Sequence, residues 1–427
     1  MLNSRVRRFR SGLDGLYHEY PHTFWVLIAG NFIDRLGTNL IMPFLAVYVL
    51  KRFNADMTQI GLILTVYSVA GIGGTFLAGA MADRFGRRAV MIIGLVVGAL
   101  ARVAMGLAAS MQGLYAAALV AGFFGVVSWP AMTAMLTDIL PEPRRADGFG
   151  IQRVTVNLGW VLGPLIGGLL APITGYLLLF ILDALTSFVM AGIIFFLLPE
   201  TRPEQAVGRP AETVGGSLGG YRLLACDGFF MAFMLVIILI LSAYQQMYST
   251  LSVYLVHYRN MAESFYGVLL TINAGMVVLV QFPITRWTSK RAPLLVMIAG
   301  TLMYLVGLTA YALVGTAALY MAAIAVVTLG EMLVTPTAQA LVALLSPKDM
   351  RARYAAAFVF TWYIPQALAP LGAGVIMDHL DPRWVWVACG LLCAVSMAGL
   401  WALHLKAGGR LIAETVGAAE GEPVPAK

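Results

Sequence analysis

Apolar segments of membrane-spanning length recur along almost the whole chain, and they constrain its fold more than any other feature. We find about twelve of them, each about 20 residues or longer, which is the length that an α-helix needs to cross a bilayer. They lie at about 23–50, 57–82, 88–108, 113–140, 149–172, 174–198, 227–257, 264–287, 294–315, 318–345, 354–377 and 384–406. Because each helix satisfies its own backbone hydrogen bonds in lipid, the sequence predicts an all-α polytopic membrane protein.

Charged residues are sparse, and the basic ones are unevenly distributed. Only 11% of the residues are charged, whereas a soluble domain has roughly 25%. If the amino terminus lies in the cytoplasm, 21 of the 28 Lys and Arg residues fall on cytoplasmic segments, as the positive-inside rule expects. The exceptions are Arg35, Arg102 and Arg153 within spans and Lys51, Arg52, Arg259 and Arg383 on outer segments. The sequence therefore predicts two cytoplasmic termini, and the net charge of +7 reflects this topology instead of a nucleic-acid partner.

The two halves of the chain match each other at one ungapped offset. The matched positions are Pro141 with Pro347, Arg145 with Arg351, Pro164 with Pro370, Gly168 with Gly374, Gly61 with Gly267, Thr65 with Thr271 and Pro130 with Pro336. This agreement predicts two related six-helix halves with the same orientation, since six is an even number of crossings. The expected parts are a cytoplasmic amino-terminal segment at 1–22, bundles at 23–198 and 227–406, a cytoplasmic linker at 199–226 and a disordered tail at 407–427.

The loop between the second and third predicted spans reads "GAMADRFGRRAVM" (79–91). It resembles the G-x-L-A-D-R-x-G-R-R signature of the major facilitator superfamily, with Met81 in the leucine position. Two parallel repeats of six helices are also the architecture of those transporters, whose substrate site lies between the halves near the midplane. The resemblance covers essentially the whole chain and implies the twelve-helix major facilitator fold.

The same resemblance implies a conformational latch at the cytoplasmic face. Its residues would be Gly79, Asp83, Arg84, Gly86, Arg87, Arg88 and Asp138. Asp83 and Arg87 would hold the outward-open state through contacts with neighbouring helices, and Asp138 is the expected partner of Arg87. A charged loop that only fixes the topology is the simpler alternative. The second-half counterpart "TRWTSKRAP" (285–293) lacks the Asp and the Gly, so any latch there is expected to be weaker.

A second motif lies within the span at 149–172, where "NLGWVLGPLIGGLL" (157–170) contains residues that form helices poorly. In water each glycine costs a helix about 1 kcal/mol and a proline about 3 kcal/mol. Glycines four residues apart form a smooth groove for a neighbouring helix, and a proline permits a bend. The pattern is similar to the g-x-x-x-G-P-x-x-G-G antiporter motif of drug-exporting facilitators, which implies an exporter. The motif residues are Gly159, Gly163, Pro164, Gly167 and Gly168.

One departure from the drug-antiporter pattern concerns proton coupling. Proton-coupled members of those families usually have an arginine in R-x-x-x-G-x-x-x-A/G. The matching region here, "LYAAALVAGFFGVVSWP" (114–130), has none. Whether Arg102 in the preceding span takes over this role is left open by the sequence.

Polar residues form a single stripe on the first predicted span. In "GNFIDRLGTNLIMP" (30–43) a helical projection places them within about 140° of one another. They are Asn31, Asp34, Arg35, Thr38 and Asn39. Ionisable groups at this depth are costly and mark functional sites by default, so we expect the stripe to face a cavity. A structural ion pair between Asp34 and Arg35 is the alternative.

A second acidic candidate, Glu331, lies near the centre of the span at 318–345, shortly before Pro336. A lone carboxylate is costly to keep ionised at this depth, which favours uptake of a proton or attraction of a cationic substrate. A structural hydrogen bond to a neighbouring helix is the alternative. Asp183 is nearer the outer face and is a weaker candidate.

Aromatic and amide residues of other spans are candidates for the wall of the substrate cavity. They are Trp129, Tyr244, Gln245, Gln246, Tyr248, Asn273, Trp362, Tyr363 and Gln366. Aromatic faces attract cations and amides orient a ligand, although each of these side chains could equally serve ordinary helix packing.

The sequence thus predicts a secondary transporter of the plasma membrane that exports hydrophobic or cationic small molecules by alternating access. Protons moving inward would neutralise Asp34 or Glu331. One alternative is a flippase for an amphipathic lipid or glycolipid, with Arg35 as the headgroup anchor, and another is a non-transporting sensor. No nucleophile, metal-ligand spacing, phosphate loop or ATPase motif is present, so we expect no enzymatic activity and no cofactor. The expected partners are the substrate, protons and the bilayer, and the protein is expected to be a monomer.

Overall fold

The structure, a computed structural model, describes residues 19–201, 224–347 and 350–407. The expected amino-terminal segment at 1–22, linker at 199–226 and tail at 407–427 lie largely outside these ranges.

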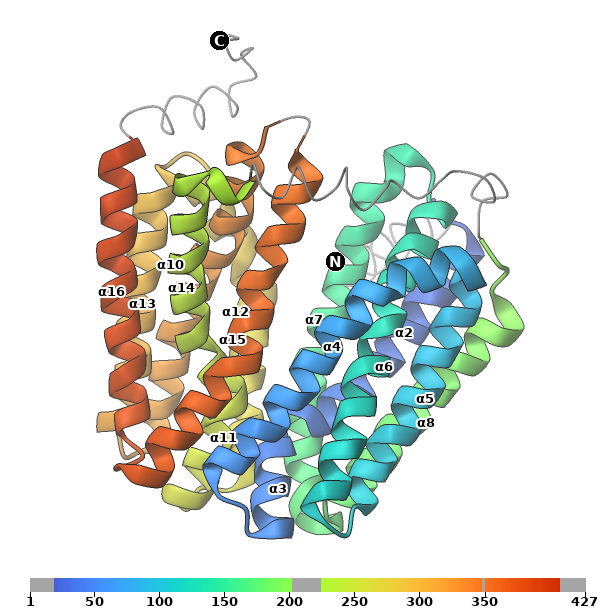
Figure 1. The fold of residues 1–427 in the computed structure, drawn as a ribbon, viewed down its shortest axis with the longest axis horizontal. Coiled ribbons are helices and arrows are strands. Elements are labelled where there is room, and N and C mark those ends of the chain that lie inside the picture. The colour runs from blue at the N-terminus through green and yellow to red at the C-terminus, as the bar shows by residue number, and fades with distance from the viewer. Residues whose placement is uncertain (1–18, 202–223, 348–349, 408–427) are drawn as a thin grey trace, which may run out of the picture. The chain divides into compact units, whose positions relative to one another are not determined.

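Every long element within the described ranges is an α-helix, and the helices form twelve spans that are long and apolar enough to cross a membrane (Figure 1). The first-half spans are α2 (His22–Ile41) with α3 (Leu45–Phe53), α4 (Met57–Phe85), α5 (Arg87–Leu107), α6 (Met111–Ile139), α7 (Arg145–Thr174) and α8 (Tyr176–Leu197). The second-half spans are α10 (Gly228–Ser249), α12 (Glu263–Thr288), α13 (Pro293–Leu313), α14 (Ala317–Leu345), α15 (Arg351–His379) and α16 (Trp384–Ala407). The predicted all-α fold with twelve spans is confirmed.

Two of the predicted spans are interrupted. The short 3-10 helix η1 (Met42–Phe44) separates α2 from α3, because Pro43 has no backbone N–H to donate to the preceding turn. α10 is followed by the single turn α11 (Leu251–Val253) and by the π-helix η4 (Tyr254–Tyr258). Insertions of this kind locally change the direction of a helix.

By packing, the chain forms two compact units. The first unit combines Met1–Met42 with Val69–Arg209, and the second combines Pro43–Ser68 with Pro210–Lys427. Residues of α4 therefore belong to both units. The division into bundles at 23–198 and 227–406 stays a prediction, because it follows the sequence repeat whereas these units follow packing.

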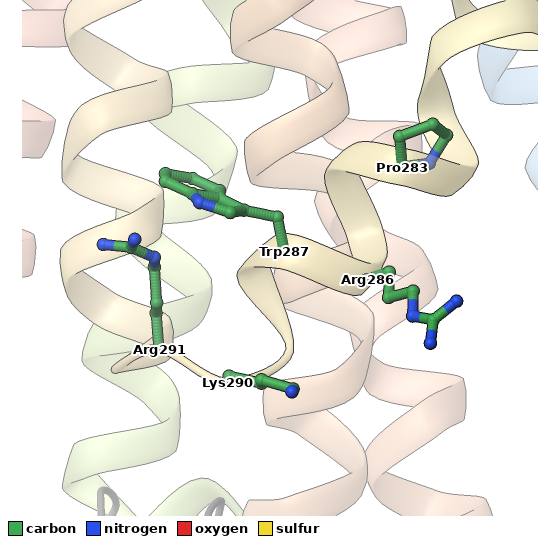
Figure 2. Close-up of a pocket in the computed structure, with 5 residues that line it drawn as sticks. All are labelled: Pro283, Arg286, Trp287, Lys290 and Arg291. Carbon is green, nitrogen blue, oxygen red and sulfur yellow. The ribbon is translucent and has the colours of Figure 1, made fainter.

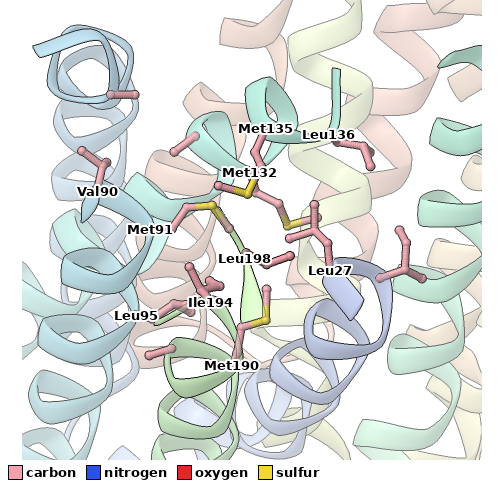
Figure 3. Packing of buried hydrophobic residues seen from close by; sticks show 14 of the residues in the cluster. Leu27, Val90, Met91, Leu95, Met132, Met135, Leu136, Met190, Ile194 and Leu198 are labelled. Carbon is pink, nitrogen blue, oxygen red and sulfur yellow. The ribbon is translucent and has the colours of Figure 1, made fainter. Parts of the chain in front are cut away.

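The core of the first unit holds together the helices on which its polar residues lie. In this unit α2 packs against α7 and α8, and α5 packs against α6 and α8. Figure 3 shows the buried apolar cluster in which these helices meet. It includes Leu27 of α2, Met91 of α5, Met132 and Met135 of α6 and Met190 of α8. Unbranched methionine side chains can fill the irregular gaps between such helices.

Within the second unit, the first turns of α4 pack closely against α15. A Cβ atom at Gly61 would lie 2.6 Å from the carbonyl oxygen of Pro370, so the two helices approach at backbone distance. The carboxylate of Asp378 accepts hydrogen bonds from the backbone N–H groups of Met57 (2.8 Å) and Thr58 (2.7 Å). These donors have no partner inside the helix, and a carboxylate stabilises a helix amino terminus. Asp378 therefore fixes the start of α4 on α15.

Candidate functional site

A network of buried polar side chains links α2, α5 and α8 in the first unit. The carboxylate of Asp183 on α8 forms an ion pair with Arg102 on α5 and accepts a hydrogen bond from the hydroxyl of Thr38 on α2 (3.2 Å). Arg102 also donates to the hydroxyl of Ser187 on α8 (2.8 Å), and that hydroxyl donates to the carboxylate of Asp34 on α2 (2.7 Å). We call these five residues the first-half cluster.

The structure places Asp183 and Arg102 at the centre of a polar network. From the sequence, Asp183 is the weaker acidic candidate and the role of Arg102 is left open. Both side chains are buried, and Ser187 connects them to Asp34, one of the two carboxylates expected to take up protons. Asp183 and Ser187 lie four residues apart and so share one face of α8, which is the signal that could have indicated the cluster.

Two other polar residues of the α2 stripe, Arg35 and Asn39, lie near α6 and α7. The guanidinium of Arg35 lies 4.9 Å from the ring centroid of Trp129 on α6, which is a cation–π contact. The Nε atom of Arg35 and the amide nitrogens of Asn31 and Asn39 are buried and have no hydrogen-bond partner among the described residues. Trp129 is 38% exposed, so the aromatic partner of Arg35 is accessible although the amides of Asn31 and Asn39 are buried.

The predicted glycine groove of α7 faces α2. A Cβ atom at Gly159 would lie 3.2 Å from Cβ of Arg35, and one at Gly163 would lie 2.5 Å from Cβ of Asn39. Pro164 lies within the continuous helix α7, and the remaining motif residues, Gly167 and Gly168, are buried. The absence of side chains at Gly159 and Gly163 therefore allows the polar ridge of α2 to pack directly on the α7 backbone.

A second polar cluster surrounds Glu331 on α14 in the second unit. The amide nitrogen of Asn273 on α12 donates to the Glu331 carboxylate (2.8 Å) and to the hydroxyl of Thr328 (3.0 Å). The amide oxygen of Asn273 accepts from the hydroxyl of Tyr248 (3.4 Å), whose oxygen lies 3.0 Å from that of Tyr244. We call these five residues the second-half cluster. It unites four sequence candidates, namely Glu331, Asn273, Tyr248 and Tyr244.

The remaining wall candidates differ in exposure and in their bonding. The Gln246 side chain is buried and donates to the carbonyl of Ala369 on α15 (2.8 Å), which ties α10 to α15. Gln245, Trp362 and Tyr363 are half-buried, and Gln366 is exposed. Gln246 is thus a structural residue.

The described residues contain no group of three or more His, Cys, Asp or Glu side chains that could hold a metal ion.

The loop between α4 and α5 is fixed by two carboxylates. Gly86 separates the two helices at φ = 90°, where a side chain would be strained. The Glu200 carboxylate accepts hydrogen bonds from the backbone N–H groups of Arg87 (3.0 Å) and Arg88 (3.1 Å) and so stabilises the amino terminus of α5. The expected pair between Arg87 and Asp138 of α6 is present as an ion pair.

The other residues of this loop are only partly described. The surroundings of Gly79 and of the Asp83 side chain lie outside the described part of the structure. Arg84 is exposed, and its guanidinium lies 5.4 Å from the ring centroid of Phe85. Sequence reasoning missed Glu200, because the signature does not include it and its distance along the chain from Arg87 gives no sign of the contact.

Comparisons with known proteins agree with one another. A family profile described as the Major Facilitator Superfamily matches residues 27–370 and 247–418. The chain is 25% identical over 418 residues to a Na(+), Li(+), K(+)/H(+) antiporter of Planococcus maritimus, which covers 91% of this chain and 97% of that protein. It is 27% identical over 144 residues to the quinolone resistance protein NorA of Staphylococcus aureus, which covers 34% of this chain and 37% of that protein. The solved structure of the nucleoside transporter NupG shares the fold, with a TM-score of 0.78, 14% identity and coverage of 90% of this chain and 100% of NupG.

Proposed function

The chain belongs to the Major Facilitator Superfamily, and we propose that within this family it exports hydrophobic or cationic small molecules in exchange for protons. Membership makes the protein a multi-pass membrane transporter and not an enzyme. The substrate, the coupling ion and the direction of transport are the parts that we propose.

The observation that carries the proposal is the second-half cluster. Glu331 lies within a membrane-spanning helix and is held by the neutral amide of Asn273 (2.8 Å). Tyr248 extends the cluster, and its ring packs edge-on against that of Tyr244 with the centroids 5.6 Å apart. A carboxylate next to aromatic rings can attract an organic cation, and the same carboxylate is neutralised when it takes up a proton. Proton and cation would thus compete for one group, which is the basis of antiport.

The names of two relatives support exchange of a cation or a drug for a proton. One is called a Na(+), Li(+), K(+)/H(+) antiporter and extends over nearly the whole chain. The other is called a quinolone resistance protein and matches about a third of it. The first name favours a second candidate function, in which inorganic monovalent cations are exchanged for protons. The oxygens of Glu331, Asn273 and Thr328 are the kind of ligand that such a cation takes.

Two further features support alternating access with both termini in the cytoplasm. The basic residues follow the positive-inside pattern. The ion pair between Arg87 and Asp138 and the close contact of α7 with α2 at Gly163 are interactions that can hold one state and permit sliding into another. We propose that the Arg87 pair acts as the latch and that the membrane is a bacterial plasma membrane.

The test uses the full-length protein in liposomes with a pH dye inside and an acidic interior. Tetraphenylphosphonium, a Na⁺, Li⁺ or K⁺ salt, or an anionic fluorescent lipid is added outside, and proton efflux is recorded. We expect tetraphenylphosphonium to make the wild-type interior more alkaline. Flux driven by the inorganic salts alone would favour the second candidate, and lipid movement without cation-driven proton flux would favour a flippase that uses Arg35.

Matched variants identify the coupling carboxylate. Glu331→Gln keeps an acceptor for Asn273 but cannot release a proton, so we expect cation-driven flux to fall to that of empty liposomes. Asp34→Asn changes the first-half cluster in the same way, and we expect it to retain flux. If Asp34→Asn loses flux and Glu331→Gln keeps it, the coupling role belongs to the first-half cluster. No flux with any cation, from folded protein that binds ligand, would rule out antiport.

A further inference from the structure

A basic hollow lies where α12 ends and the chain turns into α13. It is lined by Pro283, Arg286, Trp287, Lys290 and Arg291 and has a volume of about 710 Å³. In Figure 2 the Trp287 ring and the Arg291 guanidinium face each other on one side of the helix end, while Arg286 extends from the other side and Lys290 from the turn. The Arg291 guanidinium is 3.9 Å from the Trp287 ring centroid, which fixes the orientation of both side chains.

The three basic side chains of this hollow are not balanced by acidic ones. None of them forms an ion pair with any of the described residues, and the sequence contains no Asp or Glu between Glu263 and Glu331. In the first-half counterpart, by contrast, Arg87 pairs with Asp138. The three like charges line one hollow and repel one another, so a bound anion would be favourable. The chemistry of the hollow therefore calls for an anionic ligand.

The position of the hollow indicates where that anion comes from. The span that contains Pro283, Arg286 and Trp287 ends at Thr288, so Lys290 and Arg291 lie just beyond its end. Trp287 is 55% exposed, and exposed tryptophans at the ends of spans are typical of the headgroup layer. A phosphate ester is the anion that is abundant in that layer, and arginine binds it with two parallel hydrogen bonds.

We propose that this hollow binds the phosphate of an anionic phospholipid headgroup. Arg291 and Lys290 contact the phosphate, the exposed ring of Trp287 lies against the glycerol region, and Arg286 attracts the lipid from the opposite side of the helix end. The proposal does not depend on the transported substrate or on proton coupling, because none of these residues belongs to either polar cluster.

The test measures lipid binding to the purified full-length protein in detergent. Fluorescent phosphatidylglycerol and fluorescent phosphatidylcholine are titrated against the wild type and against Lys290→Gln/Arg291→Gln. We expect the wild type to prefer phosphatidylglycerol and the double variant to lose affinity for it by roughly fivefold for each basic side chain removed. The matched control, Arg153→Gln/Lys406→Gln, removes the same charge from two other exposed positions and is expected to keep the wild-type affinity.

Two further arms distinguish a bound lipid from a soluble anion and from a general effect of net charge. If inorganic phosphate displaces phosphatidylglycerol completely at millimolar concentration, the hollow is a site for soluble phosphate and the lipid assignment is wrong. Equal binding of the two lipids, or an equal loss in both double variants, would show that only net charge matters and would overturn the proposal. Arg291→Lys keeps the charge but loses the planar fork, so we expect a weaker affinity than in the wild type but a stronger one than in the double variant.

Discussion

The two halves of the protein hold buried charge in different ways. In the first-half cluster, Asp183 forms an ion pair with Arg102, and Ser187 links that arginine to Asp34. In the second-half cluster, the Glu331 carboxylate is held by the neutral amide of Asn273, which is in turn bonded to Tyr248. The first-half cluster includes a basic side chain, whereas the five residues of the second-half cluster join a carboxylate to amide and hydroxyl groups.

This difference separates a structural role from a transport role. A buried charge with a fixed partner makes the fold depend on both members, because removal of either one leaves the other uncompensated. A carboxylate held by neutral groups can change its protonation state at less cost to the fold, because an amide donates to it in either state. We therefore expect variants of the first-half cluster to change stability and variants of the second-half cluster to change transport.

The largest effect on stability is expected for Arg102→Ala. The substitution leaves Asp183 buried without its partner, and such a loss costs about 3–5 kcal/mol in the free energy of unfolding. The measurement is the thermal unfolding midpoint of the purified protein in one detergent. The matched change in the other cluster, Glu331→Gln, keeps an acceptor for Asn273 and is expected to shift the free energy of unfolding by no more than about 1 kcal/mol.

A double variant tests whether the loss arises from the unpaired charge. In Arg102→Leu/Asp183→Leu neither charge remains, so much of the stability lost in Arg102→Ala should return. If the double variant is as unstable as the single one, shape and hydrogen bonds dominate over charge. If Glu331→Gln instead destabilises the protein as strongly as Arg102→Ala, the proposed contrast between the halves is wrong.

The spans and the polar stripe on α2 could be predicted from local pattern, and one ion pair was implied by the resemblance to the facilitator signature. Apolar length alone defines a membrane helix, and the signature of the loop at 79–91 indicated that Arg87 pairs with Asp138. The polar stripe on α2 was visible from helical periodicity. The spans and the stripe need only the spacing of residues along one segment, whereas the ion pair rests on the resemblance.

The partners of the candidate residues could not be predicted, because they depend on which helices pack together. Arg102 and Asp183 are far apart in the chain, and only the packing of α5 against α8 brings them into contact. The same holds for Asn273 and Glu331 on α12 and α14. The contact of Asp378 with the start of α4 likewise joins segments from opposite ends of the chain. A single sequence contains no signal that selects such pairs.

A smaller effect is expected where a glycine on α7 and a glycine on α15 differ in their surroundings. A Cβ atom at Gly163 on α7 would lie 2.5 Å from Cβ of Asn39 and 2.9 Å from its backbone carbon, and backbone cannot yield as a flexible side chain does. Gly163→Ala should therefore destabilise the protein by about 1–3 kcal/mol through overpacking. Gly372 on α15 has nothing within 4 Å of its Cβ position, so Gly372→Ala should be neutral or up to about 1 kcal/mol more stable. Thermal unfolding of both variants checks this, and equal effects would contradict a closer contact at Gly163 than at Gly372.

The smallest effect is expected for the hydroxyl groups at the edge of each cluster. Tyr248→Phe removes the donor to Asn273 (3.4 Å), and a hydrogen bond of this kind contributes about 0.5–1.5 kcal/mol. If the second-half cluster binds the transported cation, this loss should appear as roughly a two- to tenfold rise in the cation concentration that gives half-maximal proton flux. Thr38→Val removes the hydroxyl that donates to Asp183 (3.2 Å), and it should lower the unfolding midpoint while leaving that concentration unchanged. Each substitution removes a single hydroxyl from one cluster alone. If Thr38→Val instead changes the half-maximal concentration and Tyr248→Phe changes only stability, cation binding belongs to the first half.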